Sequence, residues 1–116
     1  MKEQFRLIKD KSELKGTCYF EFLRGPYRKK CWCDDSVFLS EGDFALIEDV
    51  FLRRVQGYDH FSFTEIREFS WRHILTDLRQ IAAELKVAET ARAIEELCDW
   101  VEGALQEHDC VSVLGM

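Results

Sequence analysis

A long helical pattern near the C-terminal end of the chain is the strongest constraint on its fold. Within Trp71–Glu107, apolar residues recur every three or four positions, at Ile74, Leu78, Ile81 and Leu85 and again at Ile94, Leu97, Cys98, Val101 and Leu105. One continuous helix over this range would be ~55 Å long, whereas a domain of this size has a radius of gyration near ~13 Å. We therefore predict a break between Lys86 and Thr90 and two antiparallel helices, the first of them capped by Ser70.

The N-terminal part of the sequence has the two-residue period of β-strands. Thr17–Leu23 alternates apolar and polar side chains and is the clearest predicted strand. After the interruption at Gly25, Tyr27–Cys33 is predicted to return as the second arm of an antiparallel hairpin, because the connection is too short for a parallel crossover. Gln4–Lys9 is predicted as a further strand. Val37–Leu39 is either an edge strand or the approach to the first helix.

Helix signals begin in the middle of the chain. Ser40 is followed three residues later by an acid, which is typical of a helix N-terminus, and a helix is predicted over Glu41–Gln56 with Gly57 as its stop. Phe61–Phe63 alternates like a short strand, and the β-branched tail Cys110–Leu114 is predicted to return to the sheet. The fold class is therefore α+β: an N-terminal antiparallel sheet, made of a hairpin plus one or more strands, followed by three amphipathic helices and a C-terminal strand.

Composition supports one folded domain spanning residues 1–116. Apolar residues make up 47% of the chain, which suffices for a single hydrophobic core but not for two. Charged residues make up 33% and Pro and Gly are scarce, which excludes a disordered or collagen-like chain. No apolar run approaches the ~18 residues of a membrane-spanning helix. The N-terminus also lacks the apolar core of a secretory signal, so we expect a cytoplasmic protein with no membrane partner.

Charge is distributed unevenly along the sequence. The net charge is −6, yet residues 1–33 hold nine basic and four acidic side chains while the remainder holds seven and 18. Phosphate contacts need Lys or Arg, and the only basic cluster is Arg28-Lys29-Lys30. Such a short cluster also suits an exposed strand edge. We therefore expect no nucleic-acid partner.

The cysteines allow two interpretations. There are five, Cys18, Cys31, Cys33, Cys98 and Cys110, and an odd number without a secretion signal favours reduced thiols. On a strand Cys31 and Cys33 would share a face, and with Cys18 they could form part of a zinc site. The spacing differs from that of common zinc sites and no His follows at ligand distance. We therefore predict that the cysteines are metal-free and that the protein binds no cofactor.

Catalytic motifs are absent from the sequence. The histidines are His60, His73 and His108, and the last is followed directly by an acid and a thiol in His108-Asp109-Cys110. Adjacent residues rarely reach the geometry that a nucleophilic cysteine needs. No glycine-rich phosphate loop, nucleophile elbow or HExxH sequence occurs. We therefore expect a protein that is not an enzyme.

Acidic residues in the last predicted helix form a stripe. Glu95, Asp99 and Glu102 fall at i, i+4 and i+7, with Glu96 beside them, and no Lys or Arg occurs from Glu95 to the end of the chain. This pattern is typical either of a solvated face or of a docking surface for a basic partner. We predict the docking surface, with Asp34 and Asp35 extending it.

The C-terminal segment Glu95–Met116 also carries a resemblance. It combines an acidic helix containing Asp99-Trp100-Val101, a charged stop at Glu107-His108-Asp109 and a terminal Val-Ser-Val-Leu-Gly strand. This arrangement, about a fifth of the chain, resembles the ends of small bacterial immunity proteins of polymorphic-toxin and contact-dependent growth inhibition systems. The resemblance implies a cytoplasmic, non-enzymatic protein that binds and blocks one cognate toxin domain. The alternatives are a small regulatory or adaptor domain with an unrelated protein partner, and a zinc- or thiol-dependent enzyme built around Cys18, Cys31 and Cys33.

Overall fold

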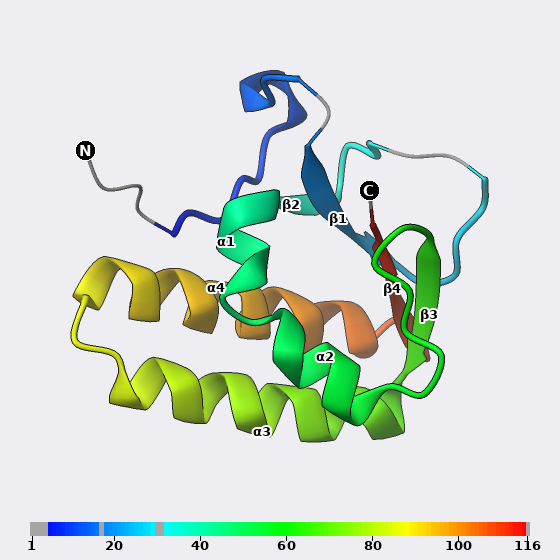
Figure 1. Ribbon diagram of the computed structural model, residues 1–116. Helices are drawn as coiled ribbons and strands as arrows, with labels where there is room; N and C mark the ends of the chain where they lie inside the picture. The colour runs from blue at the N-terminus through cyan, green and yellow to red at the C-terminus, as the bar shows by residue number, and fades with distance from the viewer. Residues whose placement is uncertain (1–4, 17, 30–31, 116) are drawn as a thin grey trace.

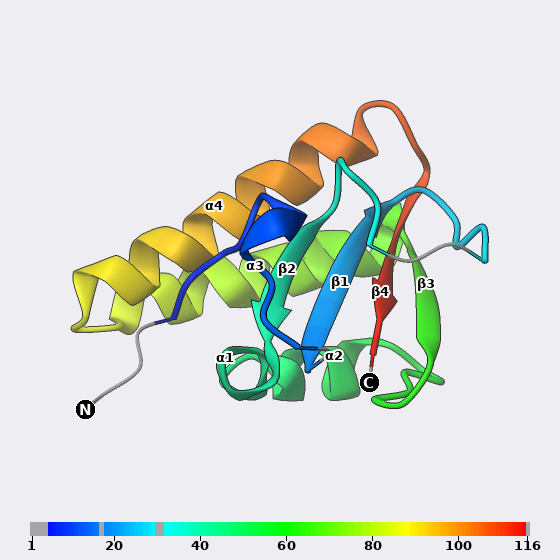
Figure 2. The same cartoon turned by 90° about the horizontal axis from the view of Figure 1, so that it is seen from above.

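A four-stranded antiparallel sheet forms the frame of the molecule. The computed structural model describes residues 5–16, 18–29 and 32–115. The strands are β1 (Tyr19–Arg24), β2 (Val37–Ser40), β3 (Phe63–Arg67) and β4 (Cys110–Leu114). Their spatial order is β2-β1-β4-β3, and every neighbouring pair is antiparallel (Figure 2). The last strand of the sequence therefore lies inside the sheet, hydrogen-bonded on both sides.

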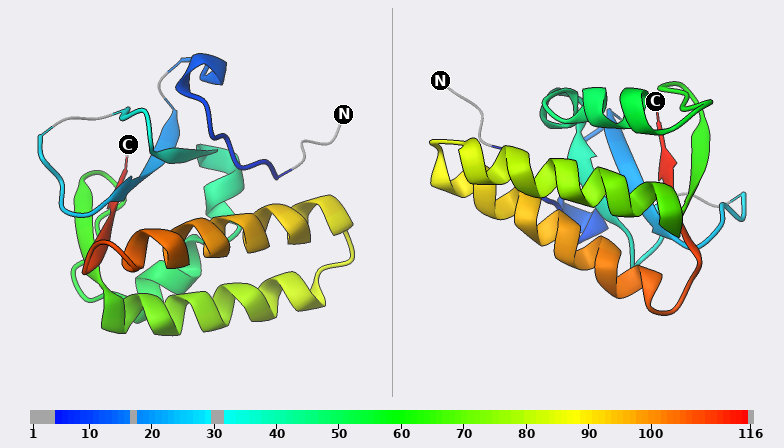
Figure 3. Two further views of the ribbon diagram at one scale, coloured as in Figure 1. Left: turned by 180° about the vertical axis from the view of Figure 1, so that it is seen from behind. Right: turned by 90° about the horizontal axis from the view of Figure 1, so that it is seen from below.

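Helices cover one face of this sheet. They are α1 (Glu41–Ala45), α2 (Glu48–Arg54), α3 (Glu68–Glu84) and α4 (Ala88–Leu105), and a short 3-10 turn, η1 (Lys11–Glu13), precedes the first strand. The long helices α3 and α4 run side by side beneath the sheet, and α1 and α2 fill the space next to them (Figures 1 and 3). This arrangement confirms the predicted α+β class. None of the described helices has the length and apolarity needed to cross a membrane.

The core lies between the sheet and the helices. Its centre is aromatic: the rings of Phe20 in β1 and Phe44 in α1 stack with centroids 4.1 Å apart, and Phe51 packs edge-on against Trp71. The Trp71 indole N–H donates to the carbonyl of Val111 at 3.0 Å, which ties α3 to the middle of β4. Both predicted apolar helix stripes face this core. Burial of large side chains there supplies most of the free energy that holds the layers together.

The predicted break in the long helical pattern is confirmed, although it covers residues 85–87 and so begins and ends earlier than the predicted Lys86–Thr90. Helix α3 ends at Glu84 and α4 begins at Ala88, so the chain reverses over three residues without Gly or Pro. Compaction decides this break rather than local propensity, because only the reversal lets both apolar stripes reach one core. The predicted C-terminal strand is confirmed too, and Val111 and Val113 are both buried.

The predicted partner of the first strand is wrong. Tyr27–Cys33 was expected to be extended, but Lys29 (φ 62°) and Trp32 (φ 59°) have positive φ angles, which no β-strand accommodates. The partner of β1 is instead β2, with Phe20 opposite Leu39. Of the predicted strand Gln4–Lys9, only Ile8 pairs, in an isolated bridge to Phe38, and Gln4 lies outside the described residues.

The predicted helix Glu41–Gln56 is two short helices. Ser40 caps the first as expected, its hydroxyl accepting from the Asp43 N–H at 3.2 Å. The helix then ends because the Leu46 N–H bonds three residues back, to Asp43. Ile47 between α1 and α2 has a non-helical ψ of −2° and is fully buried. The turn therefore depends on burial of the Ile47 side chain, and no turn-forming residue in the sequence predicts it.

The start of the first long helix, α3, also differs from the prediction. Helix α3 begins at Glu68, with Arg67 in the N-cap position, and Ser70 lies inside the helix. The Glu68 N–H donates to the Asp109 carbonyl at 3.2 Å, so the β3–β4 ladder continues up to the first helical residue. Strand β3 starts at Phe63, later than the short strand predicted at Phe61–Phe63.

Candidate functional site

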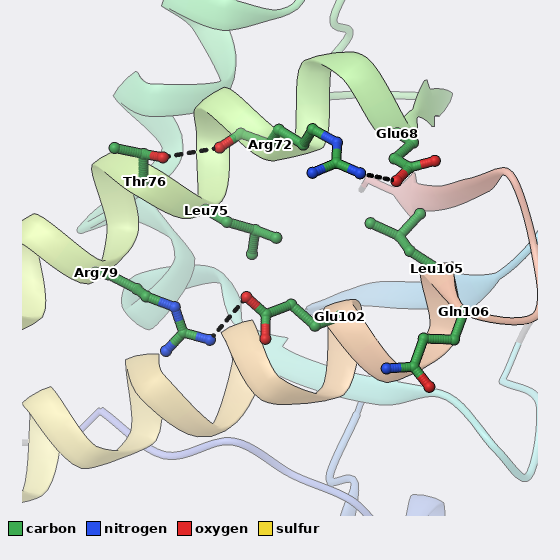
Figure 4. A pocket seen from close by; sticks show the side chains of 8 residues that line it. All are labelled: Glu68, Arg72, Leu75, Thr76, Arg79, Glu102, Leu105 and Gln106. Atoms are coloured by element: carbon green, nitrogen blue, oxygen red, sulfur yellow. Dashed lines mark hydrogen bonds and ion pairs between the residues drawn. The ribbon is translucent and has the colours of Figure 1, made fainter.

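Three acidic side chains of α4 converge on one arginine of α3. Glu95, Asp99 and Glu102 occupy successive turns on the flank of α4 that faces α3. Their common partner is Arg79, which forms ion pairs with Glu95, with Asp99 at 3.1 Å and with Glu102 at 3.1 Å. Figure 4 shows Arg79 reaching across the groove to Glu102. We call these three carboxylates with Arg79 the acidic cluster.

The acidic cluster corrects one premise of the sequence analysis. The stripe was expected to have no basic neighbour, but Arg79 provides one from an adjacent helix. Sequence spacing could not reveal this contact, because Arg79 precedes Glu95 by 16 positions and meets it only after the helices fold back. Three carboxylates still share one guanidinium, so the cluster keeps a net negative charge.

Solvent reaches every member of the acidic cluster. The exposed fractions are 42% for Glu95, 71% for Asp99 and 52% for Glu102, compared with 34% for Arg79. Partial burial lowers the pKa of Arg79, but hydrogen bonds to Asp99 and Glu102 outweigh this, and the pKa lies above its ordinary value. The guanidinium is therefore permanently charged and holds the carboxylates in place without removing them from water.

An open groove of about 570 Å³ lies beside the acidic cluster, between α3 and α4 (Figure 4). Leu75 and Leu105 provide its apolar part, and Arg72, paired with Glu68, lies at its other end. Apolar surface flanked by charged groups is typical of protein contacts.

The other three predicted binding residues lie elsewhere. Glu96 belongs to the opposite flank of α4 and pairs with Lys9 at 3.5 Å. Asp34 pairs with Lys11 at 2.8 Å. Asp35 lies 3.9 Å from Arg24, whose guanidinium stacks over the Trp100 ring. The six acids predicted as one surface therefore lie in three places: Glu95, Asp99 and Glu102 beside α3, Glu96 on the opposite flank of α4, and Asp34 with Asp35 in the loop between β1 and β2.

The four described cysteines differ in their exposure to solvent. Cys98 and Cys110 are buried, Cys18 is exposed, Cys33 is half-buried in the loop after β1, and Cys31 lies outside the described residues. Burial raises the pKa of the Cys98 thiol to about 12, so this side chain is an inert part of the core. In the described part of the chain no three His, Cys, Asp or Glu residues are grouped as metal ligands would be.

The histidines have separate environments. His60 contacts Glu48 through Nδ1, and the same carboxylate oxygen accepts from the Tyr58 hydroxyl at 3.0 Å. Burial, followed by the bond to Glu48, raises the pKa of Tyr58. His108 packs against Gly25, while its neighbour Asp109 pairs with Arg67. Of the three neighbours, Asp109 therefore contacts both Arg67 and the buried Cys110 thiol, while His108 lies against Gly25.

A buried carboxylate of β1 was missed by the sequence analysis. Glu21 is 2% exposed on the outer face of the sheet, where it accepts from the backbone N–H groups of Trp32 at 2.7 Å and Cys33 at 2.9 Å. It anchors the loop that follows β1 at Trp32 and Cys33, and the described residues 25–29 of this loop present the exposed Arg28 and Lys29. The available signal was an acid at the centre of an otherwise apolar strand.

Comparisons of the chain with protein-family models, with curated proteins and with solved structures found no match. The chemistry of the surfaces described above therefore carries the functional inference.

Proposed function

We propose that the chain neutralises a cognate toxin domain by binding it directly, as the immunity proteins that its C-terminal segment resembles do. It acts in the cytoplasm and by contact rather than by catalysis. The partner is a protein domain with a basic surface. The observation that supports this proposal is the acidic cluster, in which three exposed carboxylates outnumber their single guanidinium.

The cluster has the properties of a charged docking surface. Arg79 holds Glu95, Asp99 and Glu102 in fixed positions, so a partner does not have to order them on binding. Because they remain in contact with water, a basic side chain approaching them is attracted at long range and pays little desolvation. The neighbouring groove offers the half-buried Leu105 for apolar contact, and the largely buried Leu75 also belongs to its lining.

Co-expression tests the function itself. The product of the gene directly upstream should inhibit growth when expressed alone, and expression of this chain should restore growth and yield a stable complex. A regulatory or adaptor domain, the alternative function, would leave the toxicity unchanged because its partner is unrelated. Failure to rescue growth or to bind the upstream product would contradict toxin neutralisation.

Opposite charge changes in the acidic cluster test the docking surface. Glu95→Gln combined with Asp99→Asn should slow association with the basic partner about threefold or more at low salt, because steering charge is lost. Arg79→Gln should have the opposite effect and speed association about twofold or more, because the carboxylates lose their counter-charge. Stopped-flow association rates at several ionic strengths measure both effects, which should fade as salt increases.

Glu89→Gln serves as the matched control, since it removes one exposed charge from the first turn of α4, away from Arg79. This variant should associate at nearly the wild-type rate. Equal rates and a flat salt dependence for all variants would show that the cluster serves only to join α3 to α4.

A further inference from the structure

Strand β3 forms one border of the sheet (Figure 2). The Gly115 N–H donates to the Ser62 carbonyl at 2.8 Å, and the Glu68 N–H donates to the Asp109 carbonyl at 3.2 Å. In an antiparallel ladder, residues that bond to the neighbouring strand alternate with residues that do not. The backbone groups of the alternate residues therefore point outward, away from β4. These residues are Phe63, Glu65 and Arg67.

This border is open in the described part of the chain. The outward-pointing N–H groups of Phe63, Glu65 and Arg67 and the carbonyls of Phe63 and Glu65 form no backbone hydrogen bond there, while the Arg67 carbonyl lies at the N-cap of α3 and accepts within the first helical turn. The opposite border differs, because Phe38 of β2 exchanges two backbone hydrogen bonds with Ile8 at 2.8 and 2.9 Å. An edge with unpaired backbone groups is a template for a further strand.

We propose that β3 pairs antiparallel with β3 of a second copy of this chain, giving a two-fold symmetric dimer with one continuous sheet. The charges of Glu65 and Arg67 favour a second copy of the chain as the partner strand, and they also favour one register of pairing. When Glu65 stands opposite Arg67 of the second copy, the two-fold axis repeats the pair, and both cross-strand pairs join opposite charges. The register that places Glu65 opposite Glu65 is disfavoured by repulsion.

The charges on β3 favour pairing with an identical strand rather than preventing such pairing. Charged side chains can protect an edge, because like charges repel when they stand opposite each other in two paired strands. Here the outer-face charges are of opposite sign and two residues apart, and both side chains are exposed. They complement an identical strand that runs in the opposite direction.

Exposed aromatic side chains flank this edge. Phe63, at the start of β3, is 47% exposed although its ring packs against Tyr27, and Phe69, in the first turn of α3, is 74% exposed beside the His73 ring. The two-fold axis brings the Phe63 end of one copy to the Phe69 end of the other. Both apolar surfaces are then covered in the dimer, which independently supports a second copy as the occupant.

Sedimentation equilibrium from about 10 µM to about 1 mM tests this dimer, which is expected to be weak because its interface is small. The wild-type chain should dimerise with rising concentration. Glu65→Arg alone and Arg67→Glu alone should each raise the dissociation constant about tenfold or more, because like charges then face each other. The double exchange, Glu65→Arg with Arg67→Glu, should restore dimerisation to within about threefold of wild type.

The double exchange separates cross-strand pairing from damage to the monomer. Within the monomer, Glu65 accepts from the Tyr27 N–H and Arg67 pairs with Asp109. Each single variant loses one of these contacts and the double exchange loses both, so only restored cross-strand pairing can make the double exchange dimerise better than the single variants. Glu89→Arg changes net charge as much as Glu65→Arg but lies on α4, and it should dimerise as wild type does. A monomer throughout the concentration range, or a double exchange no better than the single variants, would overturn the proposal. This inference does not rest on the proposed toxin binding, since β3 and the acidic cluster are separate surfaces.

Discussion

Glu21 shows how one side chain determines the path of a whole segment. Its carboxylate is buried on the outer face of β1 and accepts two backbone N–H groups of the following loop, from Trp32 and Cys33. Lys11 adds a second attachment, donating to the Trp32 carbonyl at 3.3 Å. Because an ionised carboxylate has only acceptors, it matches converging N–H groups better than a neutral side chain could.

Glu21→Gln should therefore destabilise the protein by about 2 kcal/mol, since one charge-assisted hydrogen bond is lost and an amide donor faces an N–H group. Urea unfolding of the dilute protein measures the loss, and faster proteolysis after Arg28 or Lys29 should accompany it. Glu65→Gln is the control, because its carboxylate accepts only the Tyr27 N–H at an exposed site. The control should cost under about 0.5 kcal/mol. Equal stability of Glu21→Gln and wild type would show that other contacts hold the loop.

At the scale of elements, charged pairs join helices whose apolar faces already meet. Arg54 at the end of α2 reaches Asp77 in α3 with two hydrogen bonds, at 2.7 and 3.0 Å. Arg79 joins α3 to α4 through single contacts with three carboxylates. The Arg54–Asp77 pair is bidentate and so constrains the orientation of α2 on α3 as well as their distance.

The Arg54–Asp77 pair predicts a specific acid sensitivity. The hydrogen bond from Arg54 holds the pKa of Asp77 below its ordinary value. A carboxyl group whose pKa is lower in the folded state stabilises the protein above its unfolded pKa, and this contribution disappears as the pH falls through the folded pKa. Asp77→Asn should therefore remove part of the stability at neutral pH and flatten the decline below about pH 4.

Unfolding free energies of wild type and Asp77→Asn, measured from neutral pH to about pH 2, test this prediction. The two curves should converge at the acid end. Asp49→Asn is a control from the same region, because the Asp49–Arg53 pair is exposed, lies within α2 and joins no two elements. Parallel curves for Asp77→Asn and wild type would contradict the link between Asp77 and acid stability.

The whole molecule depends on its last strand. Strands β1 and β2 form one pair, β3 lies at the far border, and β4 alone connects them. Removing Cys110–Met116 would separate these parts and take Val111 and Val113 out of the core. The loss should reach several kcal/mol from the apolar side chains alone, at about 1.5–3 kcal/mol each, and the ladders on both sides would be lost as well.

We therefore expect the chain without Cys110–Met116 to lose its cooperative thermal transition. Val111→Ala is a milder perturbation of β4, and it should lower the free energy of unfolding by about 1–3 kcal/mol while keeping the fold. Circular dichroism melting distinguishes the two results. A truncated chain that melts at the wild-type temperature would contradict a central role for β4.

Local patterns in the sequence determined much of this architecture. The three- and four-residue spacing of apolar side chains located α3 and α4, because one helix face must be buried whatever it packs against. The alternation over Thr17–Leu23 located β1, which the structure places at Tyr19–Arg24, and Ser40 marked a helix start through its own hydroxyl. Chain length against domain size even required the turn after Glu84.

Only the tertiary structure determined which residues distant in the sequence come into contact. Arg79 neutralises part of an acidic stripe that looked uncompensated, because two helices fold back on each other. Val37–Ser40 replaces the nearer Tyr27–Cys33 as the partner of β1, because its buried apolar residues fit beside the core while Glu21 draws the polar loop over the outer face. Contacts between distant residues depend on how elements pack, and a pattern read along a single chain contains no record of that packing.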